Sequence, residues 1–110
     1  MHHHVRRSAA LAVVIAAVAA VPTSASAATK TVTIDDFEFS PASLSVTKGT
    51  KVKWRFADSA THNVTVRSGP VKFHSPDKRS GTYRKKLKTA GTYKIYCSIH
   101  PDMRQTITVR

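Results

Sequence analysis

The sequence predicts an all-β protein, a two-sheet Greek-key β-sandwich preceded by a signal peptide. Apolar and polar residues alternate with a period of two in several short segments, which is typical of half-buried strands. Turn residues separate these segments roughly every 8 to 12 residues, as in sandwich folds. A basic and then apolar N-terminal stretch that ends in small residues predicts the signal peptide.

Residues 1–27 are predicted to be a secretory signal peptide. Two arginines precede an apolar run over residues 9–21, which is shorter than the about 20 residues that a membrane-spanning helix needs. Ala25 and Ala27 complete a cleavage motif of the A-x-A kind. We therefore expect residues 28–110 to form one exported domain, periplasmic or extracellular. The arginine pair fits the general or the twin-arginine export route, and the choice stays open.

The expected exported domain is strongly basic. It holds 16 of the 18 Lys and Arg residues and all six Asp and Glu residues, so its formal charge is +10. Such a balance favours partner proteins with acidic docking surfaces, or association with an anionic cell envelope. Export argues against nucleic acid as a partner, and we expect the domain to act as a monomer.

The alternating segments predict about seven or eight short strands and no helix. We expect strands over residues 31–35, 37–39, 44–46, 51–56, 62–66, 82–87, 92–97 and 105–109. The first two are expected to be continuous across a bulge at Asp35-Asp36. The clearest alternation places Val52, Trp54 and Phe56 on one face, with cationic side chains facing outward between them.

Cys97 is the only cysteine, so the chain cannot form an internal disulfide bond. Small exported domains usually compensate for a modest core with disulfides or a bound metal. Because Cys97 ends a strand on the same face as Tyr93 and Ile95, its thiol is expected to point inward. A metal ligand is therefore the interpretation that we favour for this residue.

Cys97, His100 and Met103 lie in one short loop, in the order Cys-Ser-Ile-His-Pro-Asp-Met. A thiolate, an imidazole and a thioether together suit copper far better than magnesium or calcium. A second imidazole would complete a trigonal plane, and His62 fits because it shares a face with apolar residues. His74 lies in a polar run and is expected to be a surface residue. Zinc suits one Cys and two His as well, but the thioether argues against it.

These segments resemble the cupredoxin family. Residues 81–103, which contain Gly-Thr-Tyr-Lys-Ile-Tyr-Cys-Ser-Ile-His-Pro-Asp-Met, are similar to the C-terminal half of a cupredoxin. Residues 61–64, Thr-His-Asn-Val, resemble the segment with the first histidine of that family. The likeness covers essentially all of residues 28–110. Its Cys-to-His and His-to-Met spacings correspond to the short-loop, amicyanin-like form rather than to plastocyanin.

The resemblance implies a type 1 copper site that carries single electrons between redox partners, and no enzymatic activity. It implies that His62, Cys97 and His100 bind one copper ion in a plane, with Met103 as the axial ligand. It also implies that the Asn63 N–H donates to the Cys97 sulfur.

The likeness is not complete, because relatives commonly have Pro where this chain has Ile99. We hypothesise that the Ile99 N–H gives the Cys97 sulfur a second hydrogen bond.

Three other functions remain open at this point. A copper storage or delivery protein could use the same ligands without an electron-transfer role. A copper oxidase or nitrite reductase would need further copper sites, which His74 alone cannot build. An adhesive sandwich could bind anions through its basic faces, but this reading leaves Cys97 unexplained.

Overall fold

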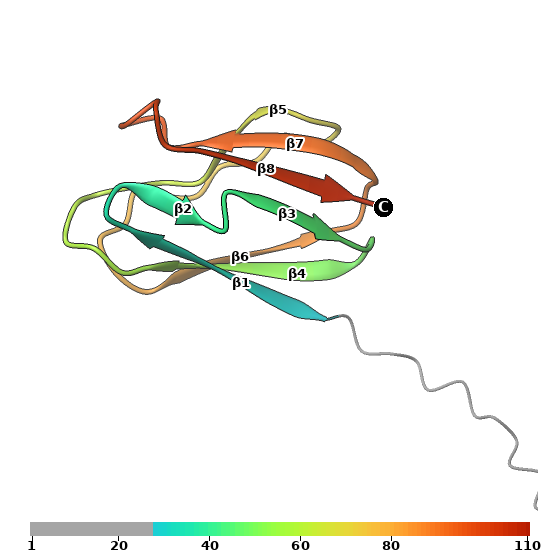
Figure 1. Cartoon of the computed structure of the whole chain (residues 1–110), viewed down its shortest axis with the longest axis horizontal. Coiled ribbons are helices and arrows are strands. Elements are labelled where there is room, and N and C mark those ends of the chain that lie inside the picture. Colours follow the sequence, from blue (N-terminus) through green and yellow to red (C-terminus); the bar gives the residue numbers. More distant parts are fainter. Residues whose placement is uncertain (1–27) are drawn as a thin grey trace, which may run out of the picture.

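The computed structural model describes residues 28–110, and the predicted signal peptide lies outside the described residues. Eight strands form two four-stranded sheets that pack face to face (Figure 1). The strands are β1 (Thr29–Asp35), β2 (Glu38–Ser40), β3 (Ser43–Val46), β4 (Thr50–Phe56), β5 (Thr65–Ser68), β6 (Thr82–Leu87), β7 (Gly91–Tyr96) and β8 (Arg104–Val109). The predicted all-β sandwich is confirmed. The described part contains no helix that could cross a membrane.

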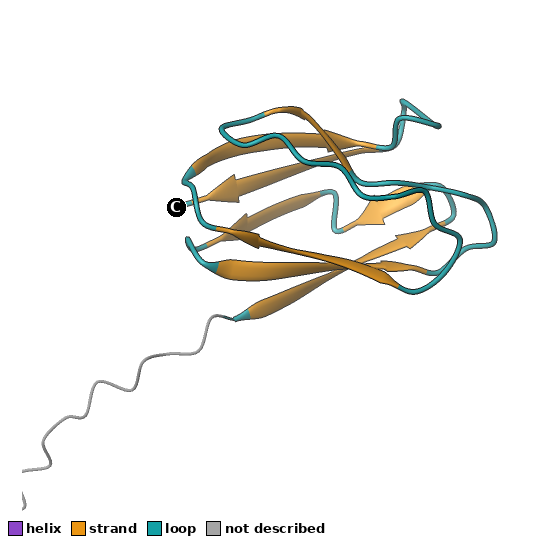
Figure 2. Cartoon of the chain, turned by 180° about the vertical axis from the view of Figure 1, so that it is seen from behind, coloured by secondary structure: helices purple, strands orange, loops and turns teal. Residues whose placement is uncertain are grey.

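The chain passes repeatedly from one sheet to the other. One sheet has the strand order β2-β1-β4-β6 and the other has β3-β8-β7-β5. β1 pairs with β4 in parallel and β3 pairs with β8 in parallel, whereas the remaining pairs are antiparallel. The passages from β4 to β5 and from β5 to β6 run through the long loops seen from behind in Figure 2, whereas the other passages between the sheets use short turns. At one end, the β1–β2 turn, the segment between β4 and β5, and the β7–β8 loop lie together (Figure 1).

Two details of the predicted strands are wrong. β1 ends at Asp35 and β2 begins at Glu38, with a tight turn at Asp36-Phe37 in place of the expected bulge. Both turn residues have positive φ, 53° and 59°, as the two central residues of a type I′ hairpin turn require. β5 begins at Thr65, because the backbone of His62 leaves the sheet and pairs with Lys78 instead.

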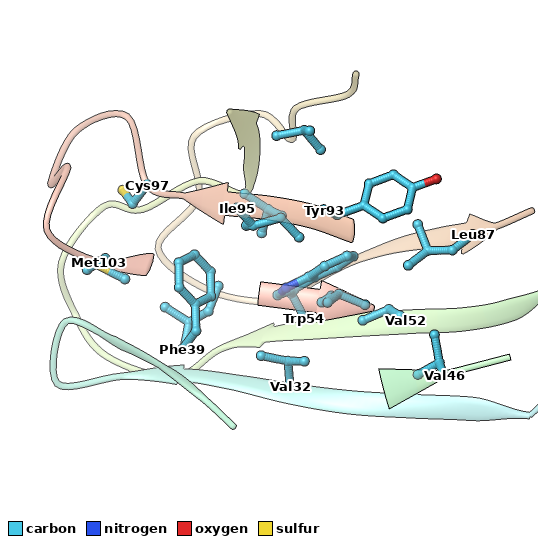
Figure 3. Close-up of a cluster of buried hydrophobic side chains, with 14 of the residues drawn as sticks. Val32, Phe39, Val46, Val52, Trp54, Leu87, Tyr93, Ile95, Cys97 and Met103 are labelled. Carbon is cyan, nitrogen blue, oxygen red and sulfur yellow. The ribbon is translucent and has the colours of Figure 1, made fainter. Parts of the chain in front are cut away.

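Trp54 lies fully buried at the centre of the core, between the two sheets (Figure 3). Its indole N–H donates a hydrogen bond to the Gln105 side-chain oxygen at 2.9 Å, which links β4 of one sheet to β8 of the other. Gln105 in turn donates to the Pro41 carbonyl at 2.8 Å. Cys97 and Met103 lie at one end of this core, as Figure 3 shows. Two sulfur atoms are therefore buried at that end of the sandwich.

Replacing Gln105 with Met should destabilise the protein by about 1–3 kcal/mol, because the buried Trp54 N–H would lose its hydrogen-bond partner. Urea unfolding of residues 28–110, which contain both sheets, measures this loss. Thr92→Val, an exposed change on β7, should alter stability by no more than about 0.5 kcal/mol. Equal effects of the two changes would contradict the inter-sheet role of Gln105.

Candidate metal centre

The predicted ligands gather at the end of the core where the three loops meet. Cys97, His62 and Met103 are buried, with exposures of 0%, 1% and 3%, and His100 is half-buried. The Cys97 Sγ and the His62 Nδ1 are 4.0 Å apart. The rings of His62 and His100 meet edge to face, with their centroids 5.0 Å apart. Side chains 35 residues apart in the chain thus form one cluster.

Asn63 joins the segment that carries His62 to the loop that carries Cys97. Its backbone N–H points at the Cys97 Sγ at 3.4 Å. Its side-chain amide donates to the Ser98 hydroxyl at 2.8 Å, and its side-chain oxygen accepts from the Ser98 N–H at 2.9 Å. The contact with the Cys97 sulfur confirms the hydrogen bond that the family resemblance implied for Asn63. The thiol and the imidazole consequently keep a defined mutual position.

Asp58 fixes the orientation of the His62 ring. Both carboxylate oxygens of Asp58 lie 2.8 Å from the His62 Nε2. Because an ionised carboxylate can only accept hydrogen bonds, Nε2 must carry the proton, and a neutral ring then keeps its free lone pair on Nδ1. That lone pair faces the Cys97 sulfur. Carboxylates commonly hold metal-binding histidines in this way.

The surroundings of Asp58 favour its ionised form. Burial by itself would raise the pKa of the Asp58 carboxyl, but the hydrogen bonds it accepts outweigh burial and lower that pKa below its ordinary value. The larger of these come from the Phe37 N–H and the His62 ring, and another comes from the Ala60 N–H. A lowered pKa means that the folded protein binds the Asp58 proton more weakly than the unfolded chain does.

Phe37 covers the two histidines from the β1–β2 turn. Its ring contacts the His62 ring at a centroid distance of 5.1 Å and the His100 ring at 4.8 Å, edge to face in both cases. Positive φ is unfavourable for a bulky residue, and backbone strain of this kind is concentrated at functional sites. The Phe37 N–H donates to Asp58 at 3.2 Å, so the same carboxylate holds the turn and the His62 ring.

The residues around Cys97 fit a soft metal, because two of the donor atoms lie at a suitable separation. Bond lengths of about 2.3 Å to sulfur and about 2.0 Å to nitrogen would separate the two donor atoms by roughly 3.5–3.8 Å, close to the observed 4.0 Å. Within residues 28–110, however, no three His, Cys, Asp or Glu side chains form a ready metal-binding group. His100 directs its Nε2 at the Thr61 carbonyl, 3.3 Å away.

Sequence reasoning located some neighbours of the site and missed others. His74 is exposed, as expected. The hydrogen bonds of residues 28–110 include none from the Ile99 N–H to the Cys97 sulfur, so the structure does not support the second bond that we hypothesised. Asp58 and Phe37 were not singled out. A carboxylate four residues before His62 was the one signal that could have indicated Asp58.

Comparison with known proteins gives a consistent result. The profile of the cupredoxin-like domain matches residues 8–109. Amicyanin-alpha of Methylorubrum extorquens is 31% identical over 106 residues, covering 93% of this chain and 88% of the relative. A copper(I) form of an amicyanin mutant is 29% identical with a TM-score of 0.68, covering 74% of this chain and 82% of that chain. A copper-containing nitrite reductase from Thermus scotoductus SA-01 has the same TM-score at 28% identity, but the match covers 22% of that chain.

The fold and the site together define a class: small β-sandwich proteins with soft donor atoms in the loops at one end. Within that class, the matched profile and the amicyanin relative show that this chain belongs to the cupredoxin-like domain family.

The stability of the copper-free protein should depend on Asp58 at acidic pH. Because the pKa of Asp58 is lowered on folding, its contribution is fully present above about pH 4 and is lost as the pH falls through the folded-state pKa. Asp58→Asn should therefore lower the melting temperature at neutral pH. The melting temperature of this variant should also decrease less than that of the wild type as the pH is lowered. Asp35→Asn, at an exposed carboxylate, is the matched control. Parallel pH curves for wild type and Asp58→Asn would contradict this role.

Proposed function

We propose that this protein is an exported carrier of single electrons that binds one copper ion through His62, Cys97, His100 and Met103. The observation that carries the proposal is the pairing of the Cys97 Sγ with the His62 Nδ1 lone pair, held by Asn63 and Asp58. The copper content of the amicyanin structure that this chain resembles supports the choice of metal. When bound, copper supplies a centre that gains and loses one electron as Cu(I) and Cu(II).

The residues of this chain prepare the centre in three ways. Asp58 holds the His62 ring, and the Asn63 N–H points at the thiol sulfur, so two donors need little movement on metal binding. Burial of Cys97 and Met103 against the core excludes water from the two sulfur atoms. His100 is expected to turn its ring toward this pair, since it supplies the remaining imidazole. Two donors anchored on a stiff sandwich favour small structural change between the redox states.

His100 is also where an electron would enter or leave. It lines a surface hollow of about 480 Å³ together with Phe37, Ile99 and Pro101. Ile99 and Phe37 are exposed apolar side chains, 42% and 49% exposed respectively. Electron-transfer encounters are small and short-lived, and an apolar rim around an imidazole edge suits them.

Copper reconstitution of residues 28–110 tests the proposed function. We expect one copper per chain and an intense blue colour from the Cu(II)–thiolate bond in a trigonal site. Cys97→Ser should abolish the colour because it removes the thiolate, and His62→Ala should abolish it because it removes an in-plane imidazole. His74→Ala, at the exposed histidine, is the matched control and should leave the spectrum unchanged.

The same experiment separates the alternatives. Copper bound without colour would contradict the electron-carrier proposal and favour storage or delivery. Failure to bind copper, with tight binding of zinc, would contradict the choice of metal. Reversible one-electron reduction and reoxidation of the blue form, followed by absorption, would complete the support.

A further inference from the structure

The acidic residues of the sandwich are confined to the end that holds the candidate metal centre. Asp35, Asp36 and Glu38 lie in or beside the β1–β2 turn. Asp58 contacts His62, Asp77 accepts a hydrogen bond from the Asn63 side chain, and Asp102 lies in the β7–β8 loop. The flanks of the two sheets therefore carry positive charge without acidic neighbours of their own.

One of these flanks is hollowed. A surface hollow of about 610 Å³ lies over the outer face of β5, β7 and β8, which run side by side (Figure 1). Three cationic side chains line it, Arg67, Lys94 and Arg104, and all three are exposed. Among residues 28–110, the one carboxylate within ion-pair distance of a basic side chain is Asp58, which contacts His62, so no carboxylate of the described part lies that close to these three cations.

The hollow also contains groups that suit contact with a protein. The Arg67 guanidinium lies over the Tyr96 ring, 5.4 Å from its centroid, which holds the cation in place at the rim. The Lys94 ammonium donates to the Thr106 hydroxyl at 3.4 Å, and Arg104 donates to the Pro101 carbonyl at 3.2 Å. Side chains that are already held lose less conformational freedom when a partner binds.

The position of the hollow connects it to the candidate metal centre. Tyr96 and Arg104 face each other as the last pair of the β7–β8 ladder. Tyr96 precedes Cys97 and Arg104 follows Met103. Both ends of the ligand-bearing loop, residues 97–103, therefore adjoin the hollow. A molecule seated in the hollow would therefore contact the base of that loop.

We propose that this hollow is the docking surface for an acidic segment of the redox partner protein. The inference rests on the proposed electron-carrier function, because it names the surface that the partner contacts. Carboxylates of the partner pair with Arg67, Lys94 and Arg104, and an apolar or aromatic side chain of the partner packs on Tyr96. The charge of +10 on residues 28–110 raises the encounter rate, but the hollow determines where the partner settles.

Binding of a fluorescein-labelled peptide of alternating Glu and Gly to residues 28–110 tests this surface. The double variant Arg67→Glu/Arg104→Glu should weaken binding about tenfold, since it reverses two contacts in the hollow. The control Lys51→Glu/Arg55→Glu makes the same change in net charge on exposed positions of β4, in the other sheet. At about 0.1 M salt, where charges are screened beyond about 10 Å, it should weaken binding about twofold at most.

An NMR titration of the wild-type protein with the same peptide provides a second readout. The amide signals of Ser68, Tyr96 and Thr106 should move, and those of β4 should stay in place. Equal weakening by the two double variants would overturn the proposal, since net charge alone would then explain binding. Absence of peptide binding, with binding to phosphatidylglycerol vesicles instead, would overturn it in favour of the envelope surface. Copper-free protein serves for all of these measurements, so a failure here is distinct from failure of the electron-carrier proposal.

Discussion

The hydrogen bonds of Asn63 are the constraint on which the candidate site depends. They connect a segment that has left the sheet, residues 57–64, to the loop that begins at Cys97. Without this connection, His62 and Cys97 would belong to two independent loops at the end of a sandwich. With it, backbone and amide contacts fix the position of the imidazole relative to the thiol.

Asp58 and Phe37 extend this constraint to a third loop. The Asp58 carboxylate holds the His62 ring and also accepts the Phe37 N–H, so the β1–β2 turn closes over both histidines. The strain of a phenylalanine with positive φ is maintained by these contacts and by the register of β1 with β2. The β1–β2 turn, the β4–β5 crossover and the β7–β8 loop thus meet at one end of the sandwich.

Much of this arrangement could be predicted from the sequence. The alternation in residues 51–56 predicted a buried strand around Trp54, and the strand before Cys97 predicted an inward thiol. The apolar neighbours of His62 distinguished it from His74. The family resemblance predicted the hydrogen bond from the Asn63 N–H to the Cys97 sulfur, which the structure confirms.

Other features depend on tertiary structure that local patterns do not encode. A phenylalanine at a positive-φ turn position contradicts its own preference, so the alternation of Phe37 with Phe39 predicted a strand instead. The backbone of His62, between β4 and β5, pairs with that of Lys78, between β5 and β6. The alternation of apolar and polar residues within one segment cannot predict a bridge between two loops. Net charge could be counted from the sequence, but the gathering of all six carboxylates near the candidate centre required the fold. That gathering leaves the β5-β7-β8 flank as the cationic surface that we propose for contact with an acidic partner.

The central claim is that His62 and Cys97 donate to one metal ion. X-ray absorption at the copper edge, on copper-loaded residues 28–110, tests it most directly. We predict scattering from one sulfur at a short distance together with imidazole nitrogen, and loss of the sulfur contribution in Cys97→Ser. A copper ion surrounded by nitrogen and oxygen alone in the wild-type protein would contradict the claim.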